Sequence, residues 1–201
     1  MKPADADHPT LRDAVLDAAD ALFFLRGFHR VAIDEIRDAA GVSLKALYGQ
    51  FPSKQAIVDA YLARRDHRWR DLLESYVTSR SADPGEQLLL TFDGLSAYLR
   101  SAKQVPHCAF QQAYGQLAGG PADAVEMIRS HKADVQANFV RRARSAGLRE
   151  PQALGQQLML LFEGALITGA VQQDPRAGQT ARAAAAVLIT AAAAEPTLHA
   201  R

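Results

Sequence analysis

Three features of the sequence predict an all-α fold. Ala, Leu, Arg, Gln and Asp dominate the 201-residue chain. Apolar residues recur every three or four positions, which places them on one face of a helix. The alternation of β-branched and polar residues that is typical of strands is missing. With 48% hydrophobic and 22% charged residues, the chain has the composition of a soluble globular protein and the length for a sizeable core.

The N-terminal segment is predicted to form one helix followed by two short ones. The first helix ends near Gly27, because glycine readily adopts the left-handed backbone that closes a helix. The short helices cover Ile33–Ala40 and Leu44–Gln50. Helices of two turns are marginal alone, so neighbouring helices must hold them. The apolar faces are Leu11, Val15, Ala18, Ala19 and Leu22 in the first helix, Ile33, Ile36 and Ala40 in the second, and Leu47, Tyr48 and Phe51 in the third.

The short helices are joined by Gly41, Val42 and Ser43. Gly41 permits the left-handed geometry that ends the second helix, Val42 fills the corner, and Ser43 is suited to cap the third helix. This arrangement is a helix-turn-helix, in which the outer residues of the second helix are free to enter a major groove. We expect those outer residues to be Ser43, Leu44, Lys45, Ala46 and Gln50.

The remainder of the chain is predicted to contain six further helices, for about nine in all. Ser53 caps a long fourth helix that runs to about residue 80, and the segment "SADPGE" then marks the clearest break. Beyond the break we expect helices at 86–102, 107–117, 122–146, 151–173 and 176–194. Their joints are Pro106, Gly119 to Pro121, Gly147 and residues 174–178.

Several classes of function lack support in the sequence. The net charge of +1 gives no overall attraction to a polyanion, so nucleic-acid binding would need a local patch. A single Cys excludes an internal disulfide, and no signal-like or membrane-length apolar run is evident, so a cytoplasmic protein without membrane contact is expected. No Gly-rich phosphate loop, nucleophile elbow or zinc-protease motif occurs. We therefore expect no enzyme, no catalytic residue, no cofactor and no metal site.

Five short motifs give the N-terminal third a specific resemblance. They are "ALFFLRGF", "IDEI", "AAGVS", "LY" at residues 47–48 and "FPSK" at residues 51–54. In this order and spacing, over roughly residues 10–62, the chain resembles the DNA-binding head of the TetR family of bacterial transcriptional regulators. The resemblance implies a homodimer of all-α subunits. Its parts would be a helix-turn-helix head at 1–53, a linking fourth helix at 54–80, and a ligand-binding and dimerisation domain at 81–201.

The resemblance, carried over residue by residue, implies a set of DNA contacts. Lys45 is the main candidate for a base or phosphate contact, and Gln50 for a base edge. Lys54 lies in the first turn of the fourth helix, where the helix dipole also attracts phosphate. Hydroxyls of Ser43 and Tyr48 suit phosphate oxygens, Leu44 and Ala46 share the exposed face, and Arg12 and Arg30 extend the patch. The alternative is that Tyr48 belongs to the core and Lys45 is a solvated charge.

Two residues depart from the family pattern. Ala32 stands where the family usually has Thr or Ser as helix cap and phosphate contact. Arg37 stands where a small residue usually faces the recognition helix, so its long side chain must extend outward or shift the packing. Both departures affect the details of the head more than its class.

In the C-terminal part, aromatic and sulfur-containing side chains either line a ligand pocket or fill the core. Glu163, in an apolar helix, needs a partner: an Arg, the other subunit, or a polar or cationic ligand, in that order. Cys108 is either an inert small hydrophobe or a thiol sensor beside His107. The candidate pocket residues are Trp69, Phe92, Tyr98, Cys108, Phe110, Tyr114, Phe139, Met159, Phe162 and Glu163.

The last two helices combine small and large apolar residues, which permits close helix packing. The family resemblance implies that they form a symmetric four-helix dimer interface. Its expected residues are Leu158, Leu161, Ala165, Gly169, Ala184 and Leu188. The Arg-rich runs at 64–70 and 141–149 are interpreted as solvated faces, with Trp69 turned inward.

We therefore expect a regulator that represses transcription, binds a palindromic double-stranded DNA operator as a homodimer and is released by a small-molecule effector. The effector would move the fourth helix and change the spacing of the two heads. Alternatives are a regulator without an inducer, an activator, or a helical adaptor that binds protein through the head. The adaptor would tolerate loss of Lys45 and Lys54 and show no salt-dependent DNA affinity.

Overall fold

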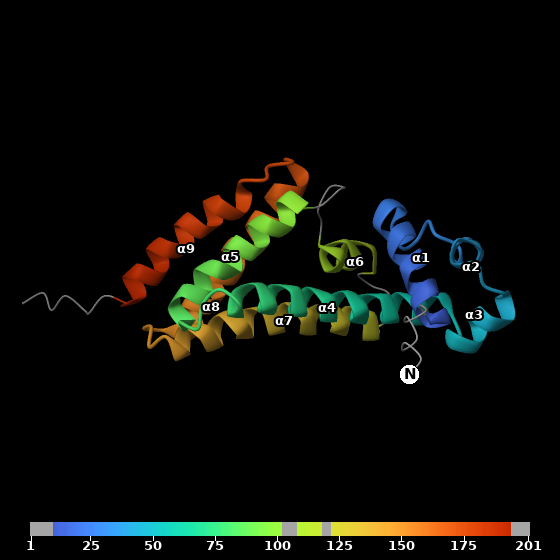
Figure 1. Cartoon of the computed structure of the whole chain (residues 1–201), viewed down its shortest axis with the longest axis horizontal. Coiled ribbons are helices and arrows are strands. Elements are labelled where there is room, and N and C mark those ends of the chain that lie inside the picture. The colour runs from blue at the N-terminus through green and yellow to red at the C-terminus, as the bar shows by residue number, and fades with distance from the viewer. Residues whose placement is uncertain (1–9, 102–107, 118–121, 194–201) are drawn as a thin grey trace, which may run out of the picture. The chain divides into compact units, whose positions relative to one another are not determined.

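A computed structural model describes residues 10–101, 108–117 and 122–193, and these ranges contain nine α-helices and no strand (Figure 1). The all-α prediction is confirmed, with helix ends close to those expected. The expected joints at Pro106 and at residues 119–121 lie outside the described residues. The helices are α1 (Leu11–Arg26), α2 (Ile33–Ala40), α3 (Leu44–Gln50), α4 (Lys54–Thr78), α5 (Pro84–Ser101), α6 (Ala109–Leu117), α7 (Ala122–Ser145), α8 (Pro151–Val171) and α9 (Ala177–Ala193).

The chain divides into two compact units. The head unit combines Met1–His67 with Ala109–Ile128, and the body unit combines Arg68–Cys108 with Arg129–Arg201. Helices α4 and α7 therefore contribute residues to both units. The expected boundaries after residues 53 and 80 stay predictions, but this division adds α6 to the head, which the sequence did not indicate.

The head unit is built around aromatic side chains. Phe23, Phe28 and Tyr61 are buried, with ring centroids 4.9 to 5.8 Å apart. Helix α1 packs against the two short helices, α2 and α3, and holds them in place (Figure 1). Thr10 starts α1 with a capping box, in which its hydroxyl accepts a hydrogen bond from the Asp13 amide at 3.1 Å. The short helices are thus stabilised by tertiary packing, as their length requires.

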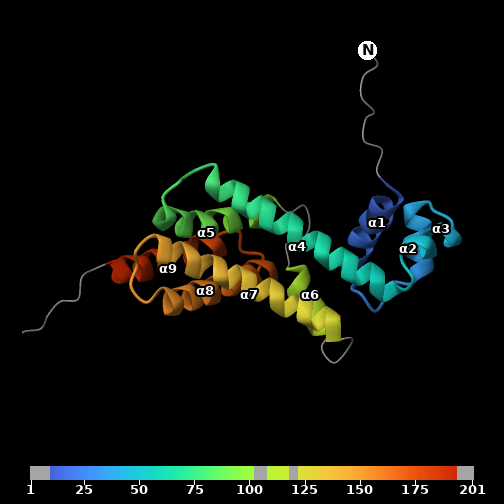
Figure 2. The same ribbon diagram turned by 90° about the horizontal axis from the view of Figure 1, so that it is seen from below.

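The body unit has its own aromatic core, formed by Phe92, Phe139 and Phe162 with ring centroids 5.8 to 6.0 Å apart. Helix α8 packs against α9 and α5, and α5 against α9 (Figure 2). Gly155 allows α8 to approach α7 closely, because a Cβ atom there would lie 2.4 Å from Val140 Cγ2 and 2.9 Å from its backbone nitrogen. Small residues thus set the helix spacing in this core.

Helix α8 is apolar enough, by length and a mean hydropathy of 1.3, to cross a membrane. Half of that apolar window is buried within the protein, and residues such as Leu158 and Phe162 belong to the body core. The core helix of a water-soluble domain has the same composition.

Candidate nucleic-acid interface and ligand cavity

The turn between α2 and α3 has the expected geometry. Gly41 adopts the left-handed conformation, with φ 66° and ψ 30°. Its amide donates to the Asp38 carbonyl at 3.2 Å, and the Val42 amide donates to the Arg37 carbonyl at 3.3 Å, which is the Schellman pattern of a helix end. The Ser43 hydroxyl then accepts from the Ala46 amide at 3.2 Å and caps α3. The turn therefore joins two helices within three residues.

The outer face of α3 carries most of the expected contact residues. Ser43, Lys45 and Gln50 are exposed, and Ala46 is half-buried. Leu44 is 42% exposed and Tyr48 is 46% exposed. Leu47 and Phe51 are buried and fix the inner face. The expectation that Tyr48 belongs to this inner face was wrong, because Tyr48 is turned about 100° from Leu47 around the helix.

The cations that flank α3 differ in environment. The Arg12 guanidinium lies over the Phe51 ring, 4.7 Å from its centroid. Lys54 is half-buried at the start of α4; burial lowers the pKa of its ammonium group, and the nearby Glu35 carboxylate opposes that effect. Arg30 is exposed, and its carbonyl accepts a hydrogen bond from Arg26 at 3.0 Å.

The two departures from the family pattern are both compensated. Ala32 provides no side-chain cap, but its amide donates to the Glu35 carboxylate at 2.8 Å. This hydrogen bond and the adjacent Arg26 lower the pKa of Glu35. Arg37 extends along α2 and pairs with Asp34 at 2.7 Å and Asp38 at 2.6 Å. Its charge is neutralised on α2, as expected for a side chain that extends outward.

Helix α6 closes the loop between α1 and α2. Gln116 Oε1 accepts a hydrogen bond from the Phe28 amide at 2.7 Å. The Gln116 carbonyl lies 2.6 Å from His29 Nε2, and the Gln112 amide donates to the Phe23 carbonyl at 3.4 Å. No local sequence signal indicates these contacts, because their partners are almost 90 residues apart in the chain.

The body unit contains a cavity of about 280 Å³ between α4, α5 and α7. Its lining mixes aromatic and aliphatic groups with charges of both signs. The lining residues are Trp69, Arg70, Asp71, Leu73, Glu74, Thr91, Asp134, Val135, Asn138, Phe139, Arg141 and Arg142. A concave site that joins apolar walls to a few polar groups is typical of small-molecule binding.

Only part of the expected pocket set lines this cavity, namely Trp69 and Phe139. Tyr98 lines a smaller cavity of about 140 Å³ with Trp69. Three other members, Phe92, Met159 and Phe162, are buried in the body core, and Cys108 and Glu163 are half-buried. The last two belong to the head unit, where Phe110 is buried and Tyr114 is exposed. Trp69 is turned inward as expected, with its ring centroid 5.0 Å from that of Tyr98.

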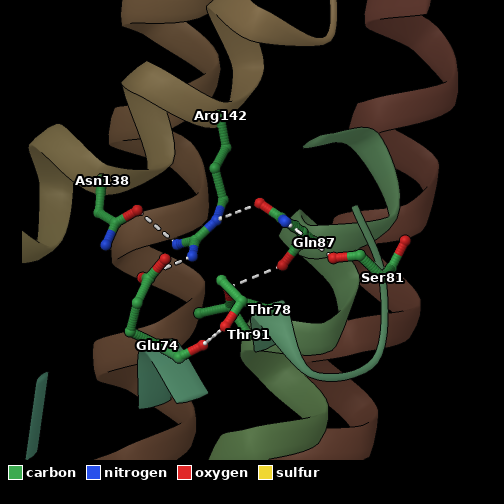
Figure 3. Close-up of polar contacts among 7 residues, drawn as sticks. All are labelled: Glu74, Thr78, Ser81, Gln87, Thr91, Asn138 and Arg142. Carbon is green, nitrogen blue, oxygen red and sulfur yellow. Dashed lines mark hydrogen bonds and ion pairs between the residues drawn. The ribbon is translucent and has the colours of Figure 1, made fainter. Parts of the chain in front are cut away.

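Arg142 lines the cavity, which the sequence did not lead us to expect. Figure 3 shows its polar contacts. The Arg-rich run at its position was expected to be solvated, but its side chain is only 7% exposed. It donates to Glu74 Oε2 at 2.7 Å, to Gln87 Oε1 at 3.1 Å and to Asn138 Oδ1. Helical spacing contains the missing signal, since Arg142 follows the apolar Phe139 by three residues.

Glu163 pairs with a lysine, although an arginine was ranked first. Lys132 Nζ donates to its two carboxylate oxygens at 2.9 and 2.8 Å and lies 3.4 Å from Cys108 Sγ. The neighbouring His131 is buried, and burial, helped by the Lys132 charge and opposed by Glu163, lowers its imidazole pKa to about 4. His107 lies outside the described residues, so its expected effect on Cys108 stays a prediction.

Helices α8 and α9 both expose apolar residues. On α8, Leu160 and Val171 are each 74% exposed, with Gly164 and Ile167 between them; on α9, Val187 is 69% exposed. Of the expected interface residues, Leu158, Ala165 and Gly169 are buried within the body unit, Leu161 and Leu188 are half-buried, and Ala184 is exposed. We call the exposed set Leu160, Gly164, Ile167, Val171 and Val187 the apolar stripe.

Two short helices joined at Gly41, with α3 exposed, define a helix-turn-helix protein. The sequence model of the bacterial regulatory proteins of the tetR family matches residues 15–61, which contain this motif. Over this segment the chain is similar to the tetR family. Its members are DNA-binding regulators rather than enzymes.

Named relatives match up to about half of the chain. The HTH-type transcriptional regulator AlkX of Mycobacterium tuberculosis is 27% identical over 103 residues, covering 51% of this chain and 47% of its own length. The HTH-type transcriptional repressor KstR2 of Rhodococcus jostii is 33% identical over 89 residues, covering 40% and 44%. The chain thus spans about half the length of these relatives. A TetR-family regulator from Streptomyces coelicolor shares the fold, with a TM-score of 0.82, 23% identity, and coverage of 92% of this chain and 96% of that one.

Proposed function

We propose that this protein is a transcriptional regulator that binds double-stranded operator DNA through α3, acts as a homodimer and releases DNA when a small molecule binds the body unit. The observation that carries the proposal is the outer face of α3. There Lys45, Tyr48 and Gln50 are exposed on a helix held by a tight turn. Lys45 supplies a cation, Gln50 a bidentate amide and Tyr48 a hydroxyl, which suit phosphate and base-edge contacts.

Repression is the simplest outcome of such binding, because a dimer that covers an operator blocks access to it. The matched relative KstR2 is a repressor by its description. Since the net charge of the chain is only +1, binding depends on the local cations Lys45, Lys54, Arg12 and Arg30. Removing one of them therefore has a measurable effect.

The DNA-binding experiment compares the protein with Lys45→Ala on DNA from its own promoter, at several salt concentrations. We expect saturable, sequence-preferring binding, and Lys45→Ala should weaken it and reduce the salt slope by about 0.9 if one phosphate contact is lost. Arg176→Ala is the matched control, because it removes an exposed cation between α8 and α9 in the body unit. Binding without sequence preference, unchanged by Lys45→Ala, would instead favour the protein-binding adaptor.

The homodimer rests on the apolar stripe. Leu160 and Val171 lie three helical turns apart with Gly164 and Ile167 between them, so the exposed apolar residues form one continuous row on α8. An exposed row of this kind is typical of a helix interface between subunits. Gly164 has open space around it, which lets a partner helix approach closely.

The interface is tested by light scattering of the purified protein and two variants. We expect a dimer, and Val171→Asp should produce a monomer because it buries an unpaired charge. Leu72→Asp is the control, since Leu72 is an exposed apolar residue on α4, outside the stripe. A monomeric wild-type protein, or a Val171→Asp variant that remains dimeric, would contradict this interface.

The effector part of the proposal rests on the cavity and on α4. The cavity wall includes Trp69, Leu73 and Glu74 from α4, and the same helix contributes residues 54–67 to the head unit. A ligand with different affinities for two positions of α4 therefore shifts the population that binds DNA. A regulator without an inducer remains the alternative, in which no small molecule would change the DNA affinity.

A further inference from the structure

The buried guanidinium of Arg142 is the most distinctive charge at the cavity. In the described part of the chain, Arg142 is the one Arg or Lys residue that is buried. Its guanidinium donates hydrogen bonds to three side chains, Glu74 on α4, Gln87 on α5 and Asn138 on α7 (Figure 3). A buried cation is costly to desolvate unless its hydrogen bonds and its charge are both satisfied. The nature of these three partners therefore decides what the site can accept.

Two of the three partners are neutral amides that are held in place. Gln87 offers Oε1 to Arg142 because its own amide nitrogen donates to the Ser81 carbonyl at 2.9 Å. Asn138 lies one helical turn before Arg142 on α7. Among these three partners, the negative charge comes from Glu74 alone, whose side chain is 50% exposed. The charge of Arg142 is thus balanced by a partner that water already reaches.

A carboxylate ligand can replace Glu74 at low cost. The arriving carboxylate keeps Arg142 neutralised, and Glu74 becomes fully hydrated from a position that is already half-exposed. A cationic ligand has the opposite effect. It would draw Glu74 away from Arg142 and leave a buried guanidinium with only two neutral acceptors, which is unfavourable. The exchange therefore favours an anion over a cation.

The walls next to Arg142 define the rest of the ligand. Trp69, Leu73, Val135 and Phe139 provide aromatic and aliphatic surface in the same cavity of about 280 Å³. Aromatic rings pack well against a flat apolar group. A ligand with one carboxylate and one apolar aryl portion uses both kinds of wall.

We propose that the cavity binds an aryl-bearing monocarboxylate whose carboxylate displaces Glu74 from Arg142. This inference rests on the proposed function, since it names the class of effector for the same cavity. It also supplies a switch, because the Glu74–Arg142 ion pair joins α4 to α7. Binding of the carboxylate breaks that ion pair. The free and bound states therefore differ in a contact between α4 and α7 that the ligand itself replaces.

The test uses 4-phenylbutyrate, the neutral 4-phenylbutyramide and the cationic 4-phenylbutylamine as probes of the full chain without DNA. Trp69 is the single Trp of the chain and lines the cavity, so its fluorescence reports binding. We expect saturable binding of 4-phenylbutyrate, at least about tenfold tighter than that of the amide, because a charged hydrogen bond is gained. Equal affinities, tighter binding of the amine, or no binding at millimolar concentration would overturn the proposal.

Two variants test the exchange itself. Glu74→Gln removes the competing carboxylate and should tighten 4-phenylbutyrate binding several-fold. Asp71→Asn is the matched control, because it removes a cavity carboxylate that makes none of the three contacts with Arg142. An equal gain in both variants would show a general charge effect and overturn the exchange. Arg142→Gln should abolish the preference for carboxylate over amide. If this variant does not fold, the comparison of Glu74→Gln with Asp71→Asn still tests the exchange.

The readout separates this inference from the proposed function. The titrations involve no DNA, so carboxylate binding by a protein without sequence-preferring DNA affinity would support the cavity assignment and refute the regulator. Sequence-preferring DNA binding by a protein that binds none of the three probes would support the regulator and refute the cavity assignment. If both hold, 4-phenylbutyrate should also lower the DNA affinity, and Glu74→Gln should need less of it.

Discussion

Acidification from pH 7 to pH 5 is expected to destabilise the protein through His131. Burial, with the Lys132 charge, lowers the pKa of this imidazole to about 4, against an ordinary value of 6.5. The unfolded state therefore takes up a proton more readily than the folded state in this range, so stability is present above pH 6.5 and is lost as the pH falls. For these two pKa values, linkage predicts a loss of about 2 kcal/mol between pH 7 and pH 5.

The loss is measured by urea unfolding at several pH values, followed by circular dichroism. His131→Leu replaces the imidazole with an apolar group, and we expect its unfolding free energy to vary about 2 kcal/mol less over the same range. The absolute stability of the variant is not the test, since the substitution also changes packing in the body unit. Parallel pH profiles for wild type and variant would refute the reasoning.

Five further substitutions test the packing, the α6 contact and the helix cap by urea unfolding. Gly155→Ala should destabilise the protein by about 1–3 kcal/mol through overpacking, whereas Gly115→Ala, which meets nothing within 4 Å, should be neutral or stabilising. Gln116→Ala leaves the Phe28 amide without its acceptor and should cost about 1–3 kcal/mol, with faster amide exchange at Phe28; unchanged exchange would contradict this. Ser43→Ala should cost about 1 kcal/mol but Ser43→Gly only a few tenths, and equal losses would show that the cap is not what matters.

The local structure of the head could be predicted from sequence because its determinants are local. Gly41 and Ser43 specify the end of one helix and the start of the next within three residues. The apolar spacing of α2 and α3 then leaves few alternatives for the inner face. Even there the prediction that Tyr48 lies on the inner face was wrong. Tyr48 is aromatic, as many core residues are, but its position around α3 turns it to the surface.

The cavity could be predicted only in part, because it depends on contacts between distant segments. Nothing near Glu163 in the sequence indicates Lys132 as its partner. The sequence left open whether each aromatic residue fills the core or lines a pocket, because that choice depends on how the helices pack. Arg142 was also missed, although its spacing from Phe139 indicates that the two residues share a helical face.

The hydrogen bonds of α6 to the α1–α2 loop have a consequence for protein engineering. The head is discontinuous in sequence, since Ala109–Ile128 belongs to the same compact unit as the first 67 residues. A fragment or chimera cut after residue 67 would separate Phe28 from Gln116 and lose the acceptor that closes this loop. A head unit transplanted into another protein would therefore have to include the α6 segment, and the recipient would have to accept two junctions rather than one.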